Sequence, residues 1–220
     1  DGGNIATVDD LIGKKIGATS AAVQKLVGID CPDFGLLLSD SICTETEVID
    51  FGRLIQPRAE GEIAFVLKDR LQGPGVGISD VLAATDHLLA CIEVVDSRIE
   101  NWNIRIQDTI ADNASCGLFV LGAEKRSIHQ VDLTGCRMQM RRNGVVAAEG
   151  RGDASLGHPA SAIAWLANTF GEMGIALEPG EPLLSGSLGP LVPIEPGDSL
   201  HLEIEGLGAC RAQFGGSPEI

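Results

Sequence analysis

The stretch Arg58-Ala-Glu-Gly-Glu-Ile-Ala-Phe-Val-Leu67 decides how this chain folds. The apolar and β-branched residues that follow Glu60 predict a strand. Side chains alternate between the two faces of a strand, so Glu60 and Glu62 point to the same side, about 7 Å apart along the backbone. Ala64 and Val66 share that side, which therefore becomes apolar directly after two carboxylates. Two like charges beside an apolar core predict a bound cation, although two acids at the solvated entrance of a strand are the plainer alternative.

A third carboxylate lies inside another predicted strand. The run His87-Leu-Leu-Ala-Cys-Ile-Glu-Val-Val-Asp96 is nearly continuous in apolar residues, which is typical of a strand buried on both faces. Glu93 lies in its middle, where a glutamate is expected to be ion-paired, protonated or bound to a metal. Three carboxylates without a His/Cys ligand pattern favour a hard ion, Mg²⁺ or Mn²⁺, over zinc. The alternative is a salt bridge from Glu93 to Arg98 or Arg58.

The length and the charge of the chain limit the classes of protein to which it can belong. The chain has 220 residues, of which 44% are hydrophobic, enough for the core of a single domain over residues 1–220. Its net charge of −15, without any basic run, argues against nucleic acid or an anionic membrane as a partner. No apolar run approaches the ~20 residues of a membrane span, and no signal peptide is visible. The six cysteines are scattered without a C-x-x-C motif, which predicts reduced thiols in a cytoplasmic protein.

Two acid/base candidates precede the glutamates. Lys14 and Lys15 point to opposite sides of a predicted short strand over residues 13–20, so one of them should face inward. An inward lysine near three carboxylates is either their ion-pair partner or a desolvated acid/base. Asp33 lies in a predicted turn over residues 31–35, where it either stabilises the turn or acts as an acid/base in a cleft.

The remaining sequence predicts many strands and few helices. No phosphate-binding loop, dinucleotide fingerprint or nucleophile elbow occurs. Helices are expected over residues 7–12 and 21–27, from an N-cap at Ser79 through Thr85, and from Pro159 until Gly174 ends the helix. Strands are expected as a β-meander over residues 36–57, at 118–121, as a hairpin over 137–149 with a type I′ turn at Asn143-Gly144, and throughout the last third of the chain. The polar residues 108–115 are typical of turn chemistry.

Several short motifs together resemble one known family. They are Lys-Ile-Gly (15–17), Pro-Asp-Phe-Gly (32–35), Gln-Pro-Arg-Ala-Glu-Gly-Glu-Ile-Ala-Phe (56–65), Glu-Val-Val-Asp-Ser-Arg-Ile (93–99), Asp-Asn-Ala-Ser (112–115), Leu-Gly-His-Pro (156–159), Trp-Leu-Ala-Asn (165–168), Leu-Ser-Gly-Ser-Leu (184–188) and Pro-Gly-Asp (196–198). In this order they resemble the 2-keto-4-pentenoate (2-hydroxypenta-2,4-dienoate) hydratases of aromatic meta-cleavage pathways, in the fumarylacetoacetate hydrolase superfamily. The resemblance covers nearly the whole chain.

The resemblance implies an α+β, β-rich fold built on a rolled β-sheet with flanking helices. It implies a Mg²⁺ or Mn²⁺ ion held by Glu60, Glu62 and Glu93. It also implies acid/base roles at Lys15 and Asp33, and a substrate-carboxylate seat at Ser185, Gly186 and Ser187. Homo-oligomers built from pentamers, including decamers, are expected, and so is association with the pathway decarboxylase or aldolase. The family's N-terminal helical segment is expected to be largely missing from this sequence.

The function implied is addition of water to a small anionic dienoate, giving 4-hydroxy-2-oxopentanoate. The nearest alternative is the sister 2-oxo-3-hexenedioate (4-oxalocrotonate) decarboxylase, whose second carboxylate needs a second cation. Arg98, Arg105 or Arg151 could provide it. An acylpyruvate hydrolase is a further alternative. From a different class of protein, a non-catalytic subunit that stabilises a partner enzyme also fits, although such a subunit does not require the acid/base and glutamate residues.

Overall fold

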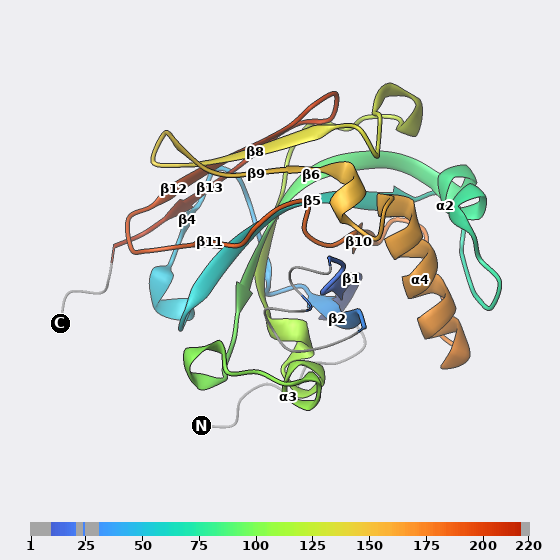
Figure 1. Ribbon diagram of the computed structural model, residues 1–220, viewed down its shortest axis with the longest axis horizontal. Coiled ribbons are helices and arrows are strands. Elements are labelled where there is room, and N and C mark those ends of the chain that lie inside the picture. Colours follow the sequence, from blue (N-terminus) through green and yellow to red (C-terminus); the bar gives the residue numbers. More distant parts are fainter. Residues whose placement is uncertain (1–9, 21–23, 25–30, 217–220) are drawn as a thin grey trace.

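Two β-sheets and a few short helices make up the structure, a computed structural model that describes residues 10–20, 24 and 31–216. Among these residues, one sheet has eight strands in the order β2-β1-β10-β5-β6-β7-β3, with β11 paired to β5, and the other has five in the order β4-β13-β12-β8-β9 (Figure 1). The strands are β1 (Leu11–Gly17), β2 (Asp33–Leu38), β3 (Ile42–Cys43), β4 (Val48–Ile49), β5 (Pro57–Leu67), β6 (Thr85–Asp96), β7 (Cys116–Leu121), β8 (Arg137–Arg142), β9 (Val145–Arg151), β10 (Pro182–Leu184), β11 (Val192–Pro193), β12 (Ser199–Ile204) and β13 (Gly208–Phe214). The α-helices are α2 (Ile78–Ala84), α3 (Ile106–Ala111) and α4 (Pro159–Glu172). The expected α+β, β-rich fold is confirmed.

The antiparallel pair of β5 and β6 forms the centre of the larger sheet. Its strands are long and curved, and they pair from Pro57 opposite Asp96 to Leu67 opposite Thr85 (Figure 1). The alternation of side chains along β5 gives its two faces different surroundings. One face, with Phe65, contributes to the large core shared with the second sheet and α4.

The other face of β5 belongs to a smaller apolar cluster. That cluster joins Ala64 to Leu89 of β6, Leu37 of β2 and Leu184 of β10, with Val66 packed against it. Glu60 and Glu62 share the strand parity of Ala64, so the predicted change from carboxylates to an apolar surface along one face of β5 is confirmed.

The predicted β-meander over residues 36–57 is wrong. β3 pairs in parallel with β7, whereas β4 pairs in parallel with β13 of the other sheet. β3 and β4 therefore pair with strands that are distant in sequence and do not pair with each other. The predicted turn over residues 31–35 is also too long, because β2 begins at Asp33 and pairs with β1. Local alternation indicates a strand without indicating its partner.

The helix predictions are correct in part. α2 begins after Gly77 rather than at Ser79, because the Asp80 side chain accepts a hydrogen bond from the Gly77 N–H at 2.8 Å, and it ends at Ala84. Residues 108–111, predicted as part of a polar turn over 108–115, belong to α3. The predicted helix over residues 7–12 overlaps β1 from Leu11 onward, and its residues 7–9, like most of the helix predicted over 21–27, lie outside the described residues.

Two local predictions are confirmed. Asn143 and Gly144 have φ values of 53° and 81° between β8 and β9, as a type I′ turn requires. α4 begins after His158, whose ring nitrogen accepts a hydrogen bond from the Ala160 N–H at 3.0 Å, and Gly174 follows its end with a φ of 76°. In the described part of the chain, no helix combines the length and apolar character needed to cross a bilayer.

Candidate metal-binding active site

Three glutamates meet on one face of the β5–β6 pair. Glu60 is directly opposite Glu93 in the register, and Glu62 is two residues further along β5 on the same face. Each offers a carboxylate oxygen, and the three oxygens lie within 4.8 Å of one another. The three side chains are only 8%, 0% and 1% exposed for Glu60, Glu62 and Glu93. The structure thus brings together the three residues that strand alternation and burial had singled out.

Burial makes this concentration of negative charge costly. Loss of solvation, followed by the charge of Glu93, raises the pKa of Glu60 to about 7. The pKa of Glu62 is raised well above its ordinary value, first by burial and then by the charges of Glu93 and Glu60. Such shifts are expected when carboxylates share a buried site.

Lys15 of β1 provides the positive charge nearest to the glutamates. Its Nζ lies 2.8 Å from Glu93 Oε1 and donates a hydrogen bond to the Ala114 carbonyl at 2.6 Å. Burial is the largest single influence and by itself would lower the pKa of this lysine, but the negative groups around it, with Glu93 the strongest among them, together outweigh burial, so the pKa is raised. The alternative of a salt bridge from Glu93 to Arg98 or Arg58 is wrong, since Glu93 pairs with Lys15 instead.

The neighbouring lysine belongs to the opposite face of β1. Lys14 Nζ forms an ion pair with Glu181 at 2.6 Å and lies 5.8 Å from the ring centroid of Phe170 in α4. The predicted opposite orientation of the two lysines is confirmed, with Lys15 facing the glutamates, and Lys14 on the other face is equally buried at 2% exposed. Each face of β1 is covered, one by α4 and the other by the glutamates.

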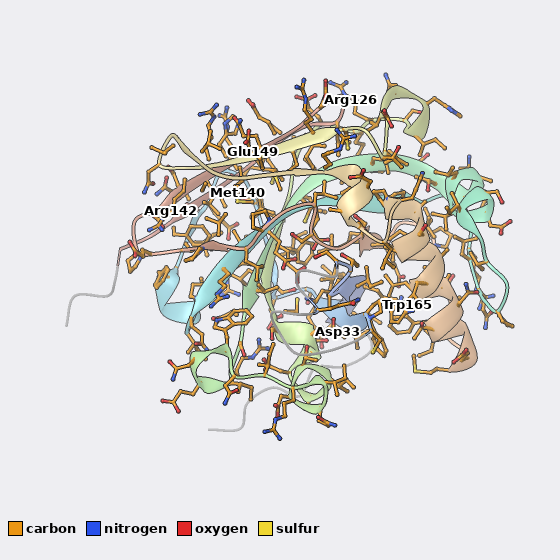
Figure 2. The ribbon with its side chains drawn as sticks, viewed as in Figure 1. Asp33, Arg126, Met140, Arg142, Glu149 and Trp165 are labelled. Carbon is orange, nitrogen blue, oxygen red and sulfur yellow. The ribbon has the colours of Figure 1, made fainter. Side chains whose placement is uncertain are left out.

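Asp33, the first residue of β2, lies beside Lys15 in a small cavity. Glu60 and Thr109 line the same cavity, and the Thr109 hydroxyl donates a hydrogen bond to Asp33 Oδ2. Figure 2 shows Asp33 in the middle of the molecule, near β2 and α3. Asp33 is 7% exposed, as befits a residue of a site rather than of a surface turn.

The segment Ser185-Gly-Ser187 reaches the glutamates through its backbone. The Gly186 N–H donates to Glu62 Oε2 at 2.7 Å. The Ser185 hydroxyl is buried and has no hydrogen-bond partner in the part of the chain that the structure describes, whereas the Ser187 hydroxyl donates to the Gly189 carbonyl at 2.7 Å. Neither serine is among the described residues that line the cavity of Lys15 and Asp33, so their role toward substrate stays a prediction.

The donor set fits a divalent cation. Within the described part of the chain, Glu62 Oε1 is buried without a hydrogen-bond partner, and one lysine forms an ion pair with this group of three carboxylates. Hard cations such as Mg²⁺ and Mn²⁺ prefer oxygen ligands of this kind, and their charge offsets the repulsion that raises the glutamate pKa values.

Three features of the site escaped the sequence analysis. Thr109 lies in a polar segment that was predicted as a turn, the Ala114 carbonyl carries no side-chain signal, and Trp102 lies between the predicted elements. A buried threonine on a short helix could have been suspected only by predicting α3.

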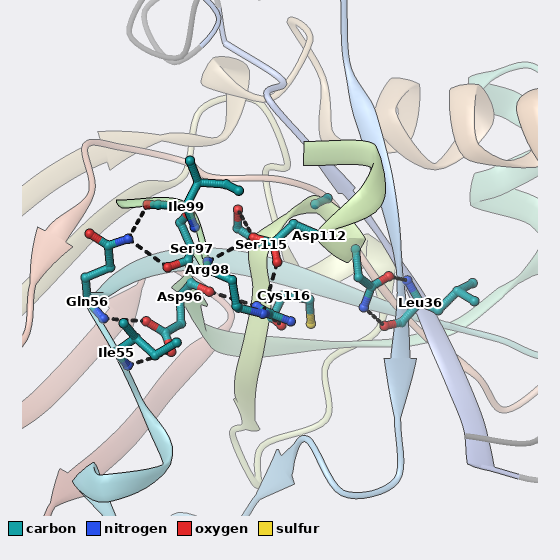
Figure 3. Close-up of polar contacts among 12 residues, drawn as sticks. Leu36, Ile55, Gln56, Asp96, Ser97, Arg98, Ile99, Asp112, Ser115 and Cys116 are labelled. Carbon is teal, nitrogen blue, oxygen red and sulfur yellow. Dashed lines mark hydrogen bonds and ion pairs between the residues drawn. The ribbon is translucent and has the colours of Figure 1, made fainter. Parts of the chain in front are cut away.

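A network of hydrogen bonds ties the end of β6 to the start of β5 (Figure 3). The Asp96 carboxylate accepts from the backbone N–H groups of Ile55 at 2.9 Å and Gln56 at 2.7 Å. The Gln56 amide donates in turn to the carbonyls of Ser97 at 2.8 Å and Ile99 at 2.5 Å. The ends of the two strands that carry the glutamates are therefore held in a defined position.

Comparison with known proteins identifies the family to which this chain belongs. The sequence pattern of the family described as fumarylacetoacetate (FAA) hydrolase C-terminal matches residues 20–215 of this chain. The chain belongs to the fumarylacetoacetate hydrolase family. It is 52% identical over 211 residues to a 2-hydroxyhexa-2,4-dienoate hydratase of Comamonas testosteroni, covering 95% of this chain and 80% of that protein. It is 55% identical over 173 residues to a 2-hydroxypent-2,4-dienoate hydratase of Pseudomonas putida, covering 78% of each.

A solved structure of a relative has the same architecture. The 4-oxalocrotonate decarboxylase from Pseudomonas putida G7, complexed with magnesium and adipate, superimposes with a TM-score of 0.89 at 38% identity, covering 93% of this chain and 78% of that one. The family and the rolled-sheet fold predicted from the sequence are confirmed. The relatives' names also confirm that this chain is a hydratase.

Proposed function

We propose that this hydratase uses a divalent cation, Mg²⁺ or Mn²⁺, to add water to 2-hydroxypenta-2,4-dienoate or a close homologue, giving a 4-hydroxy-2-oxo acid. The observation that carries this proposal is the buried set of three glutamates beside a cavity that contains Lys15 and Asp33. The hydratases of Comamonas testosteroni and Pseudomonas putida to which this chain is similar act, by their names, on six- and five-carbon dienoates.

The reaction needs two proton movements and one water. The 2-hydroxyl of the dienol loses its proton while C5 gains one, which gives a conjugated 2-oxo-3-enoate. Water then adds its oxygen to C4 and a proton to C3, and the product is 4-hydroxy-2-oxopentanoate. A cation held by Glu60, Glu62 and Glu93 would polarise the 2-oxygen and the carboxylate and stabilise the negative charge that develops there.

Lys15 and Asp33 are the proton carriers that we assign. Lys15 is positioned by Glu93 and the Ala114 carbonyl, and without metal its raised pKa keeps it protonated. The charge of a cation held by the glutamates would lower that pKa and make the lysine a better proton donor. Asp33 is held by the Thr109 hydroxyl in the same cavity and suits a group that accepts a proton from the dienol or from water. General acid/base groups of this kind typically contribute ~10²–10⁴-fold each.

The segment Ser185-Gly-Ser187 is the proposed seat of the substrate carboxylate. The Gly186 N–H donates to Glu62, and the Ser185 hydroxyl has no partner among the described residues, so a donor is available beside the carboxylate cluster. A buried hydroxyl that has no partner in the protein costs free energy unless a ligand or a water molecule forms a hydrogen bond with it.

A combined ultraviolet and CO₂ assay tests the function. Metal-loaded protein is offered 2-hydroxypenta-2,4-dienoate and 2-oxo-3-hexenedioate separately. Loss of the dienol absorbance without release of CO₂ is expected. Release of CO₂ from the dicarboxylate would instead identify a decarboxylase, and silence with both substrates in protein that binds metal would support a non-catalytic subunit.

The decarboxylase is the second candidate, because a decarboxylase is a relative of known structure. The three arginines considered for its second carboxylate do not favour it. Arg98 forms an ion pair with Asp112 at 3.0 Å, and Arg151 lies 3.6 Å from Asp153. Neither they nor Arg105 are among the described residues that line the cavity.

The oligomer remains a prediction. Pentamers or decamers of a 23.0 kDa chain are expected from the family resemblance. Light scattering coupled to size-exclusion chromatography measures the mass, and a monomer in the presence of metal would contradict the expectation.

A further inference from the structure

The cavity beside the glutamates is lined by both polar and apolar side chains. Lys15, Asp33, Glu60 and Thr109 are among its polar residues. The apolar lining is contributed by Val95, Trp102, Ile104 and Leu191. Among the described residues that line the cavity, Lys15 is the single cation, and it is already paired with Glu93.

Trp102 is held in place by its surroundings. Its indole N–H donates to the Gln56 carbonyl at 3.0 Å, and the Arg58 guanidinium carbon lies 4.6 Å from the centre of its ring. Asn101 and Trp102 both have a φ of 56°, a conformation that residues other than glycine rarely adopt. Strained backbone of this kind persists where surrounding contacts impose it and is concentrated at functional sites.

The residue that accepts the indole hydrogen bond is itself fixed. Gln56 is anchored by Asp96, Ser97 and Ile99 in the network of Figure 3. The position of the ring is therefore determined by the same network that holds the glutamate-bearing strands together.

Arg58 is the cation nearest to this wall. It is half-buried, it lies two residues before Glu60 on the same face of β5, and its side chain has no ion pair or hydrogen bond among the described residues. It is also absent from the described lining of the cavity. The indole covers the guanidinium by a cation–π contact.

We infer that Trp102 is a specificity-determining residue, which favours substrates with an uncharged, apolar end and rejects those with a second carboxylate. This inference rests on the proposed function for the reaction that it serves. A second carboxylate entering the cavity would lose its hydration against the indole and aliphatic side chains without gaining a free cation, which is unfavourable. Removal of the indole would uncover Arg58 and admit a dicarboxylate.

The test is a binding measurement that does not depend on turnover. 2-Oxohexanoate and 2-oxoadipate have the same chain length and differ only in whether the last carbon is a methyl or a carboxylate. Calorimetry on Mn²⁺-loaded wild type should give at least ~10-fold tighter binding of 2-oxohexanoate. In W102A this ratio should fall towards one or invert, and in W102A/R58M the gain in 2-oxoadipate binding should be lost.

W102L is the matched control, because leucine keeps the wall apolar while losing the indole hydrogen bond and the cation–π contact. It should retain most of the wild-type ratio, which distinguishes an apolar wall from a general loss of structure. An unchanged ratio in W102A, or a wild type that binds both acids equally or binds neither, overturns the inference. Failure of the hydratase proposal would appear separately, as absent hydration by a protein whose binding ratio follows the pattern above.

Discussion

At the scale of single residues, two adjacent lysines provide a controlled comparison. Lys14 and Lys15 have the same exposure on β1, but Lys14 faces Glu181 and Lys15 faces Glu93. K15M should lower kcat by ~10²–10⁴-fold while metal is still bound, because a proton carrier is removed and all three glutamates remain.

K14M is the control for this prediction. It should lower the melting temperature, since Glu181 loses its partner, but it should not reproduce the loss of kcat. Steady-state kinetics and Mn²⁺ titration on both variants check the comparison. A loss of metal together with activity in K15M would make Lys15 a structural residue.

The glutamates are tested by removing charge without removing volume. E62Q should weaken Mn²⁺ binding by at least ~10²-fold, because Glu62 combines complete burial with an oxygen that has no hydrogen-bond partner among the described residues. Electron paramagnetic resonance of free Mn²⁺ measures the affinity. Glu178, which is half exposed in an ion pair with Arg70, provides the control variant E178Q, and equal affinities in the two variants would remove Glu62 from the site.

At the scale of elements, the segment after β10 depends on one glycine. Gly186 has a φ of 86°, and a Cβ added there would lie 2.4 Å from side-chain atoms of Thr19. Gly180 has a φ of 85° with nothing within 4 Å of such a Cβ. G180A should therefore show the backbone cost alone, about 1–2 kcal/mol.

G186A should destabilise the protein more than G180A and should also weaken metal binding. The added methyl group must displace Thr19 or move the strand end, and the Gly186 N–H that holds Glu62 moves with it. Urea unfolding and Mn²⁺ titration of both variants measure the two effects. Equal unfolding free energies and equal metal affinities would show that this turn does not position the site.

Pairing between elements accounts for the clearest error in the sequence analysis. The alternation over residues 36–57 was real, but β3 and β4 add to different sheets beside β7 and β13. Each of these strands is two residues long, so its own side chains carry little information about its partner. The hairpin at Asn143-Gly144 was predictable because its pairing is decided within the turn itself.

At the scale of the whole molecule, the glutamate cluster makes stability depend on pH and metal. Burial and Glu93 raise the pKa of Glu60 to about 7, so between pH ~4.5 and ~7 the folded state binds more protons than the unfolded state. Without added metal, the free energy of unfolding should therefore fall as pH rises through this window, by up to about 3 kcal/mol for this group. Mn²⁺ should restore more stability at pH 8 than at pH 5, since protons compete with the metal.

Urea unfolding at pH values from 5 to 8, with chelator or with Mn²⁺, checks this dependence. E60Q is the control, because its amide does not titrate and the slope without metal should be shallower. A wild-type stability that rises with pH in the presence of chelator, by the same amount as in E60Q, would show that Glu60 is ionised throughout the window.

The sequence by itself determined the strand that carries Glu60 and Glu62, their common face, and the burial of Glu93. Those properties follow from alternation and local hydrophobicity, which depend on neighbours along the chain. The resemblance supplied the family and, with it, the fold.

Only the tertiary structure decided which groups surround these carboxylates. Lys15 rather than an arginine pairs with Glu93, Thr109 holds Asp33, and Trp102 closes the apolar side of the cavity. These contacts join segments that are distant in sequence, and they depend on how β1, α3 and the loop after β6 pack against the β5–β6 pair. Local patterns encode the face on which a side chain lies, but the partner across that face is chosen by the packing of the whole chain.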